Sequence, residues 1–293
     1  MNAILIAGPT ASGKSALALE LARKADGVVI NADSMQVYDA LHVLTARPSF
    51  EEMDGVPHFL YGHVAASQKY SVGAWCQDVR AILTDPSMEA RTVICVGGTG
   101  LYFRALTDGL SAMPDIPNAI RDHWREALKQ TGAEALHAEL KSRDPKSADI
   151  LNANDSQRIV RALEVFEASG QSIRDFQDKS GTALIDTVKA HKIVLTPDRA
   201  KLKARINQRF EKMMETGAVE EVRGLLSMGL SPDLPAMKAI GVREISALLS
   251  GAMSRAQAVE RASIATRQYA KRQMTWFRNQ LDDSWVRTDP EFR

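Results

Sequence analysis

A glycine-bearing segment near the start of the chain constrains the fold most strongly. An apolar run, Ala3–Ala7, leads into Gly8-Pro9-Thr10-Ala11-Ser12-Gly13-Lys14-Ser15, and a run of strong helix formers, Ala16–Ala22, follows. Strand, glycine loop and helix in this order are the context of a phosphate-binding P-loop, in which backbone amides and the positive end of the helix face one point. The alternative, an incidental glycine turn, does not account for all eight positions together with both flanking elements. We therefore predict that this loop binds a diphosphate, or a triphosphate such as ATP.

Individual residues of this loop have separate predicted roles. Gly8 and Gly13 let the backbone turn tightly and expose its amides. Lys14 can neutralise a terminal phosphate, and the hydroxyl of Ser15 can bind a magnesium ion. Ser15 is therefore the predicted metal ligand, and Mg²⁺ is the predicted cofactor.

Three further apolar runs predict buried strands, at Val28–Ala32, Thr92–Val96 and Lys192–Thr196. Because they alternate with helical patterns, we predict an α/β fold with a P-loop NTPase-like, mainly parallel sheet and helices on both faces. Asp33 follows the first of these runs, at the strand end where such sheets bind ligands. It is a candidate base or magnesium partner, or alternatively a helix cap for the segment from Ser34 onward.

The pattern changes between residues 113 and 181, where prolines punctuate long stretches with helical spacing and no convincing strand occurs. We predict an inserted all-helical subdomain over 113–181, at the ligand edge of the sheet, within a core formed by 1–112 and 182–293. The expected helices are Ile120–Gly132, Ala133–Ser142 and Ser156–Ser169.

The last of these helices has two notable features. Asp155 is placed to cap it, and Arg158 and Arg161 are three residues apart and so share a face.

Positive charge is concentrated in the C-terminal third. Residues 196–278 hold fifteen Lys and Arg against eight Asp and Glu, although the whole chain has a net charge of only +1. Lys201, Arg205 and Arg209 form a ridge at helical spacing, and one of these arginines is expected to reach the phosphate site. Cations also interleave with aromatic residues between Arg261 and Arg278. This composition suggests a polyanionic partner such as RNA, although a solvated helical surface has a similar pattern.

Other features narrow the class of protein. The two cysteines, Cys76 and Cys95, have no paired spacing, which argues against a zinc site or a disulfide framework. No apolar run is long enough to cross a bilayer, and the N-terminal residues do not resemble a signal peptide. We expect a cytoplasmic monomer without a membrane or an obligate protein partner.

Three functions fit these residues. The first is a small-molecule kinase in which Asp33 orients an acceptor hydroxyl. The second is an enzyme acting on RNA with the P-loop holding a diphosphate leaving group, and the third is a nucleotide-regulated RNA binder without catalysis. The strand at Thr92–Val96 runs into glycines rather than into an acid, which weighs against a minimal metabolite kinase. The convergence of Lys14, Ser15 and Asp33 weighs against a pure binder.

Several motifs in fixed order carry a more specific resemblance. They follow the P-loop as Ala32-Asp33-Ser34-Met35-Gln36-Val37-Tyr38, Gly97-Gly98-Thr99-Gly100-Leu101-Tyr102, Arg158-Ile159-Val160-Arg161-Ala162-Leu163-Glu164-Val165 and Thr266-Arg267-Gln268-Tyr269-Ala270-Lys271-Arg272-Gln273. Together they resemble the tRNA dimethylallyltransferase (tRNA isopentenyltransferase) family, and the resemblance extends from the first strand to Arg278.

The resemblance implies a reaction and its partners. A dimethylallyl group would leave dimethylallyl diphosphate and join the exocyclic amine of the adenosine 3′-adjacent to the anticodon, in the anticodon stem-loop of tRNA. It also implies a P-loop sheet with a helical insertion that contacts tRNA.

The resemblance also implies roles for individual residues. Asp33 would meet the adenine amine as a catalytic residue, and Thr99 would lie near it. The diphosphate would be bound by the loop Gly8, Pro9, Thr10, Ala11, Ser12, Gly13, Lys14 and Ser15 and by Arg209. Contacts with tRNA are implied for Asp33, Ser34, Met35, Gln36, Thr99, Arg121, Gln157, Arg158, Ile159, Val160, Arg161, Lys238, Ala239, Ile240, Gly241, Val242 and Arg243.

Two positions depart from the usual pattern of that family. Leu44 stands where the family commonly has a glycine, and Phe59 stands where a second histidine is frequent. The first departure concerns the local loop geometry rather than the chemistry.

Overall fold

The computed structural model describes residues 2–179 and 181–289. The chain divides into two compact units, one formed by Met1–Thr107 and Leu184–Arg293 and the other by Asp108–Ala183. The boundaries expected from sequence, 113 and 181, lie a few residues inside the second unit.

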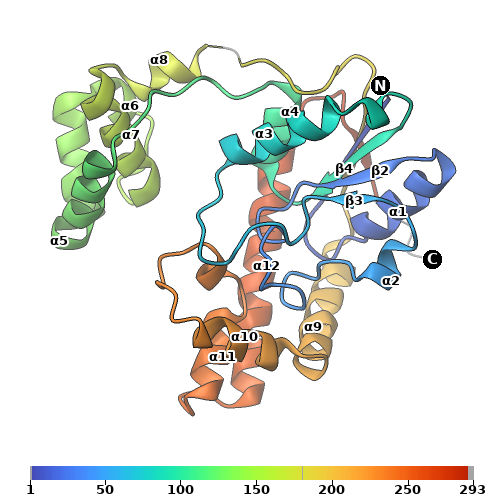
Figure 1. Cartoon of the computed structure of the whole chain (residues 1–293). Helices are drawn as coiled ribbons and strands as arrows, with labels where there is room; N and C mark the ends of the chain where they lie inside the picture. Colours follow the sequence, from blue (N-terminus) through green and yellow to red (C-terminus); the bar gives the residue numbers. More distant parts are fainter. Residues whose placement is uncertain (1, 180, 290–293) are drawn as a thin grey trace. The chain divides into compact units, whose positions relative to one another are not determined.

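The first unit is built on a parallel sheet of six strands in the order β3-β2-β4-β1-β5-β6. Figure 1 labels β2, β3 and β4 of this sheet. The strands are β1 (Ala3–Ala7), β2 (Val28–Asn31), β3 (His58–Phe59), β4 (Val93–Gly97), β5 (His191–Leu195) and β6 (Val286–Thr288). The four strands predicted from apolar runs are confirmed to within one residue at each end. β3 and β6 were not predicted, because two or three residues show no periodicity.

Both faces of the sheet are buried, as predicted. All five residues of β4 are buried. Ile6, Val29 and Ile94 pack on one face against Ala18 and Ala22 of α1 (Lys14–Lys24). Successive side chains of a strand point to opposite faces, so Leu5, Ile30 and Cys95, which are fully buried, lie on the other face. The other helices of the N-terminal half of this unit are α2 (Phe50–Met53), α3 (Val72–Leu83) and α4 (Gly100–Thr107).

Between β5 and β6, the C-terminal half of this unit is helical. It contains α9 (Arg199–Glu215), α10 (Ala218–Ser227), α11 (Val242–Leu249) and α12 (Arg255–Gln280), and α9 and α12 lie side by side (Figure 1). The buried residues of α9 include Leu202, Ile206, Phe210 and Met213, the apolar stripe expected from their spacing. α12 begins with a capping box at Ser254 and Gln257, and its far end brings Phe277 edge-on to Phe103 of α4. α12 therefore connects α11 to the layer beside the sheet.

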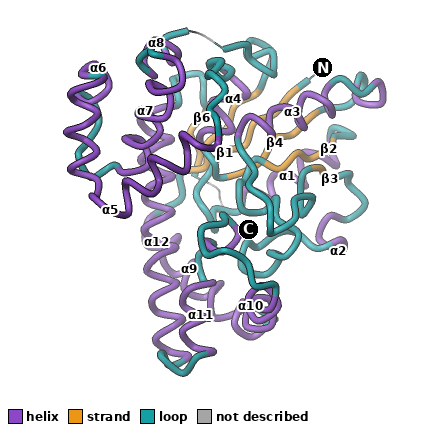
Figure 2. Tube along the Cα trace, turned by 60° about the vertical axis from the view of Figure 1, so that its left-hand side comes forward, coloured by secondary structure: helices purple, strands orange, loops and turns teal. Residues whose placement is uncertain are grey.

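The second unit holds α5 (Asn118–Arg143), α6 (Pro145–Ala148), α7 (Ser156–Ser169) and α8 (Ile173–Gln177), and its described residues form no strand (Figure 2). α5 is interrupted at Gly132, where φ is +83°, so it corresponds to two predicted helices. α7 has its predicted bounds, and the side chain of Asp155 accepts a hydrogen bond from Arg158 N as its cap. Trp124, Leu140, Ile159 and Leu163 belong to a core of this unit's own. In neither unit is a described helix both long and apolar enough to span a membrane.

Candidate active site

The loop Gly8–Ser15 connects β1 to α1 in the geometry of an anion cradle. Gly8 N donates to Gly97 O (3.3 Å), and Ser12 N donates to Pro9 O (3.2 Å). Gly13 has φ +85° and directly precedes α1, whose first amides no described side chain caps. Helix amides without intrahelical partners, at the positive end of the helix dipole, favour a bound anion.

Two cations point to this cradle. Lys14 Nζ lies 3.4 Å from Pro9 O. Burial lowers the pKa of Lys14 to about 8; nearby Asp33 opposes this change, and nearby Arg209 adds to it. Arg209 of α9 donates a short hydrogen bond to Thr10 Oγ1. Burial also lowers the pKa of Arg209, and Asp33 again opposes the change. The predicted arginine of the basic ridge therefore does reach the phosphate loop.

A buried hydroxyl completes the cradle. Ser12 is fully buried, and its Oγ has no hydrogen-bond partner among the described residues. Gly8 leaves the space that this hydroxyl occupies, since a Cβ at Gly8 would lie 2.8 Å from Ser12 Oγ. A buried polar atom without a partner fits a site that is satisfied when a phosphate oxygen binds.

Asp33 stands at the carboxyl end of β2, fixed by its neighbours. Asn31 is fully buried. Its Oδ1 accepts a hydrogen bond from Asp33 N (2.9 Å), and its Nδ2 donates one to Asp33 O (2.9 Å). The carboxylate Oδ1 of Asp33 accepts from Met35 N (2.9 Å). Thr99 lies behind this turn, because its Oγ1 accepts from Ser34 N (2.9 Å) and donates to Ser34 Oγ (3.2 Å). Thr99 thus supports the segment that carries Asp33.

A cavity of about 280 Å³ joins these parts. Thr10 and Arg209 line it on the phosphate side, together with Asp33 and the apolar side chains of Ile206 and Phe210. The whole lining belongs to the first unit and consists of Thr10, Asp33, Ser34, Met35, Leu44, Thr45, Ile206, Arg209, Phe210, Met213, Lys238, Ala239, Ile240, Thr266, Tyr269 and Arg272. The structure therefore places the anion cradle and a carboxylate around one partly apolar space.

Gln273 of α12 connects the two glycine loops beside this cavity. Its Oε1 accepts from Thr10 N (2.9 Å), and its Nε2 donates to Gly98 O (2.9 Å). Gly98 leaves room for this amide, because a Cβ there would lie 2.1 Å from Gln273 Nε2. Gln273 is buried. The sequence places it in the motif Thr266–Gln273 but did not indicate a role for it in the site. Its distance along the chain from Thr10, 263 residues, explains why spacing did not reveal its role.

Comparison with known proteins decides the family. A family model described as IPP transferase matches residues 36–280, and another described as Isopentenyl transferase matches residues 1–61. This chain belongs to the IPP transferase family. The tRNA dimethylallyltransferase of Agrobacterium fabrum is 61% identical over 289 residues, which are 99% of this chain and 97% of that protein. That of Rhizobium etli is 62% identical over 286 residues, 98% of this chain and 96% of that protein.

Solved structures agree with this assignment. The tRNA isopentenylpyrophosphate transferase of Bacillus halodurans is similar with a TM-score of 0.69 and 33% identity, over 98% of this chain and 89% of that one. A eukaryotic dimethylallyltransferase acting on tRNA is similar with a TM-score of 0.83 and 26% identity, over 99% of this chain and 75% of that one. The P-loop NTPase-like fold expected from the sequence is the fold of this family.

In the first unit of this family member, the predicted tRNA-contacting residues differ in their surroundings. Met35, Lys238, Ala239 and Ile240 line the cavity beside Asp33 and Ser34. Arg243 is exposed, whereas Val242 is buried in a core of the unit. The side-chain amide of Gln36 is already used, since its Nε2 donates to Thr45 O (2.9 Å) and Ala46 O (3.0 Å).

The predicted tRNA-contacting residues of the helical unit also differ in their exposure to solvent. Gln157 and Arg158 are exposed at the start of α7, and Arg161 is half-buried and pairs with Glu164 (3.2 Å). Ile159 and Val160 are buried in the core of this unit, so their side chains pack rather than face solvent. The Nε atom of Arg121 is buried without a hydrogen-bond partner among the described residues.

Few protein oxygens are available to a metal ion. Among the described residues, no group of three His, Cys, Asp or Glu side chains could bind one. Mg²⁺ commonly binds through one or two protein oxygens, substrate phosphates and water. The exposed hydroxyl of Ser15 at the start of α1 fits such an ion if the ion arrives with a diphosphate.

A second residue that the sequence did not single out is Glu221 of α10. Its carboxylate accepts three backbone hydrogen bonds, from His42 N (2.7 Å), Val43 N (2.6 Å) and Leu44 N (3.0 Å). Leu44 then lines the cavity and contacts Gly241, where a Cβ would lie 2.7 Å from Leu44 Cδ2. The leucine that replaces the usual glycine is therefore accommodated by a glycine opposite.

Replacing Glu221 with glutamine should loosen this loop. An amide has one acceptor oxygen for three donors, so we expect a loss of about 2 kcal/mol in the free energy of unfolding and a higher KM for tRNA. Denaturant unfolding and steady-state kinetics measure both quantities. Glu220→Gln is the matched control, because Glu220 is exposed and forms an ion pair with Arg223 on its own helix. Equal behaviour of the two variants would show that Glu221 does not position the loop.

Proposed function

We propose that this protein transfers a dimethylallyl group from dimethylallyl diphosphate to the exocyclic amine of the adenosine 3′-adjacent to the anticodon in tRNA, with release of diphosphate. The observation that carries this proposal is the single cavity lined by Thr10, Arg209 and Asp33. Its relatives, named tRNA dimethylallyltransferases, support the same reaction. We further propose that the protein acts as a monomer, which a mass measurement in solution tests.

Transfer requires breaking the bond between the allylic carbon and the diphosphate oxygen. Negative charge develops on the leaving group, and the amides of Gly8–Ser15, Lys14 and Arg209 are arranged to stabilise it. Magnesium, when bound through Ser15 together with the diphosphate, would neutralise part of the same charge.

The acceptor needs help of a different kind. The lone pair of an adenine amine is delocalised into the ring, so the amine is a weak nucleophile. The Asp33 carboxylate can accept its proton as the new carbon–nitrogen bond forms. To reach Asp33 the base must leave its stack, which is least costly in a single-stranded loop. The apolar side chains of Ile206 and Phe210 would surround the prenyl group between the two reactants.

Incubation with bulk tRNA, magnesium and labelled dimethylallyl diphosphate tests the proposal. Incorporation of the label into RNA by the unmodified protein, and its loss in Lys14→Ala, would support transfer. Consumption of ATP with a small acceptor would instead identify a kinase. Binding of tRNA and nucleotide with neither reaction would identify a regulated binder.

The pKa of Lys14 predicts a pH dependence for donor binding. Its ammonium is charged below about pH 8 and loses its proton above it. If only the charged form binds the diphosphate well, the KM for dimethylallyl diphosphate should rise about tenfold between about pH 7 and pH 9. Lys14→Arg, which stays charged, should show a flat profile over this range. The same rise in the arginine variant would assign the effect to another group.

Two cations of α12 predict the salt dependence of tRNA binding. Lys271 and Arg272 are both exposed, and Arg272 also lies over the ring of Tyr269 (5.9 Å to its centre). Replacing both with glutamine should weaken tRNA binding and make the dependence of log Kd on log salt less steep by about 1.5, since each lost phosphate contact lowers the slope by about 0.7–0.9. Filter binding at several salt concentrations measures this slope. An unchanged slope would mean that the two side chains are structural.

A further inference from the structure

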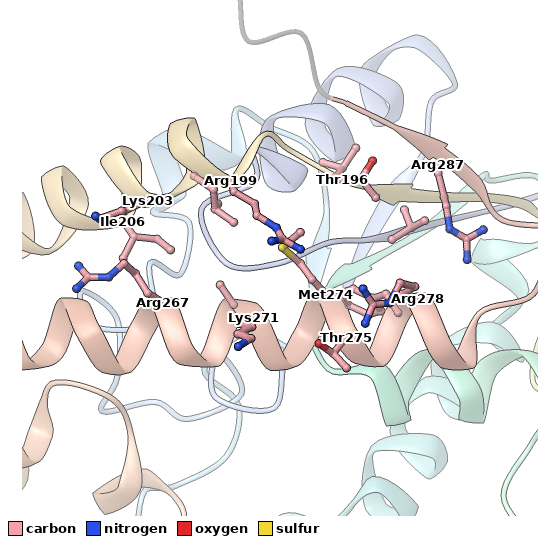
Figure 3. A pocket seen from close by; sticks show the side chains of 15 residues that line it. Thr196, Arg199, Lys203, Ile206, Arg267, Lys271, Met274, Thr275, Arg278 and Arg287 are labelled. Carbon is pink, nitrogen blue, oxygen red and sulfur yellow. The ribbon is translucent and has the colours of Figure 1, made fainter.

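A second and larger cavity, of about 540 Å³, lies in the first unit between β5, α9, α12 and β6 (Figure 3). Its volume is nearly twice that of the cavity that contains Asp33. Six lining residues are cations and none is an acid: Arg199, Lys203, Arg267, Lys271, Arg278 and Arg287. We call it the basic cavity.

The cations come from both helices at spacings that bring them to one side. Arg199 and Lys203 are four residues apart on α9, and Arg267, Lys271 and Arg278 follow one face of α12. Arg267 donates to Asn207 Oδ1 (2.6 Å), and Arg287 donates to Leu281 O (3.0 Å). Across residues 2–179 and 181–289, no ion pair joins Arg199, Lys203, Lys271 or Arg278 to a carboxylate. Cations that converge on one cavity whose lining contains no acid favour a bound anion.

The interior of the basic cavity is apolar. Leu202, Ile206, Ala270 and Phe277 are buried, and Met274 packs on the same cluster. A concave apolar floor with a cationic rim suits a small ligand with a hydrocarbon part and an anionic end. An RNA backbone would use the cations but not this floor. Ala11 of the P-loop packs against the same cluster.

The two cavities share one lining side chain. Among the described residues, Ile206 alone lines both. Neither Asp33 nor Arg209 lines the basic cavity, so its cations are separate from those proposed to hold the donor diphosphate. An anion bound there would be held independently of Lys14.

We infer that the basic cavity is a second binding site, for an organic diphosphate whose hydrocarbon chain is longer than five carbons. The diphosphate would lie among the cations of the basic cavity other than Lys271, for which a contact with tRNA is proposed above. The hydrocarbon chain would lie on Leu202, Ile206 and Met274. The inference concerns binding alone and does not depend on the proposed transfer reaction.

Binding of geranyl diphosphate is measured by calorimetry on the full chain carrying Lys14→Ala, a substitution that weakens binding of the probe at the P-loop. Adding Arg199→Gln and Lys203→Gln to this variant should weaken the binding of geranyl diphosphate at least about tenfold. Lys201→Gln is the matched control, because Lys201 is exposed on the same helix and does not line the cavity. Arg199 and Lys203 are also exposed, so these variants should fold, which thermal unfolding checks.

Geraniol and inorganic diphosphate, each tested alone, should bind at least about tenfold more weakly than geranyl diphosphate. Geraniol lacks the anionic group, and inorganic diphosphate lacks the hydrocarbon chain.

Three results would overturn the inference. Loss of binding in Lys14→Ala alone would make the cavity an extension of the catalytic site. Equal binding of inorganic diphosphate would make the apolar floor irrelevant. Weaker tRNA binding by the α9 variant, with unchanged binding of geranyl diphosphate, would make these cations an RNA surface.

Discussion

Asp33→Asn is expected to lower kcat for prenyl transfer by at least about 100-fold, the smaller end of the range for a positioned proton acceptor. The reason is chemical rather than structural. An asparagine oxygen can still accept the hydrogen bond from Met35 N that the Asp33 carboxylate accepts. It cannot take the proton of the adenine amine. The turn after β2 should therefore persist while the reaction slows.

The same substitution should leave donor binding intact or improve it. Asp33 places a negative charge near Lys14 and Arg209, since it opposes the lowering of their pKa values by burial. Removing this charge leaves more positive potential for the diphosphate, so the KM for dimethylallyl diphosphate should not rise. A fall in kcat without a rise in this KM separates a base from a residue that merely shapes the cradle.

Steady-state kinetics with tRNA and dimethylallyl diphosphate, together with tRNA binding, make the measurement. Asp39→Asn is the matched control, because Asp39 is exposed, also accepts backbone hydrogen bonds, and does not line the cavity. A kcat close to that of the unmodified protein would remove Asp33 from the role of base. It would leave the carboxylate as a ligand of the metal or as part of the turn.

Local sequence predicted the elements whose signals lie within one segment. The P-loop, the carboxyl end of β2 and the cap at Asp155 each depend on a few adjacent residues, and the structure has them where expected. Periodicity also predicted the buried stripe of α9 and the position of Arg209 beside it. These features could be predicted because the geometry of a helix or a strand fixes which neighbours share a face.

The sequence was less informative where contacts are distant or where a motif mixes two roles. Glu221 meets His42 across 179 residues, and nothing local to either residue indicates the contact. Within the motif at Arg158–Val165, the exposed arginine and the buried Ile159 and Val160 were grouped together as tRNA contacts. Helical spacing from Ile159 to Leu163 would have indicated a core stripe, so this separation could have been made from the sequence.

Gln273→Met is expected to lower both stability and activity, and its effect on stability should be the largest of those considered. Methionine keeps the length of the side chain but can neither accept from Thr10 N nor donate to Gly98 O. Because each buried polar group left without a partner costs about 1–3 kcal/mol, the loss of both partners should lower the free energy of unfolding by about 2–6 kcal/mol. Denaturant unfolding measures this change.

The kinetic signature of Gln273→Met should identify what the residue positions. Thr10 lies between Gln273 and Arg209, with its N–H bound to the first and its Oγ1 to the second. Freeing the N–H should let Thr10 move in the cradle, so the KM for dimethylallyl diphosphate should rise more than the KM for tRNA. Gln268→Met, on an exposed position of the same helix, is the control and should change neither. A rise confined to the KM for tRNA would instead mean that α12 positions the acceptor, and that the cradle is held by Arg209 alone.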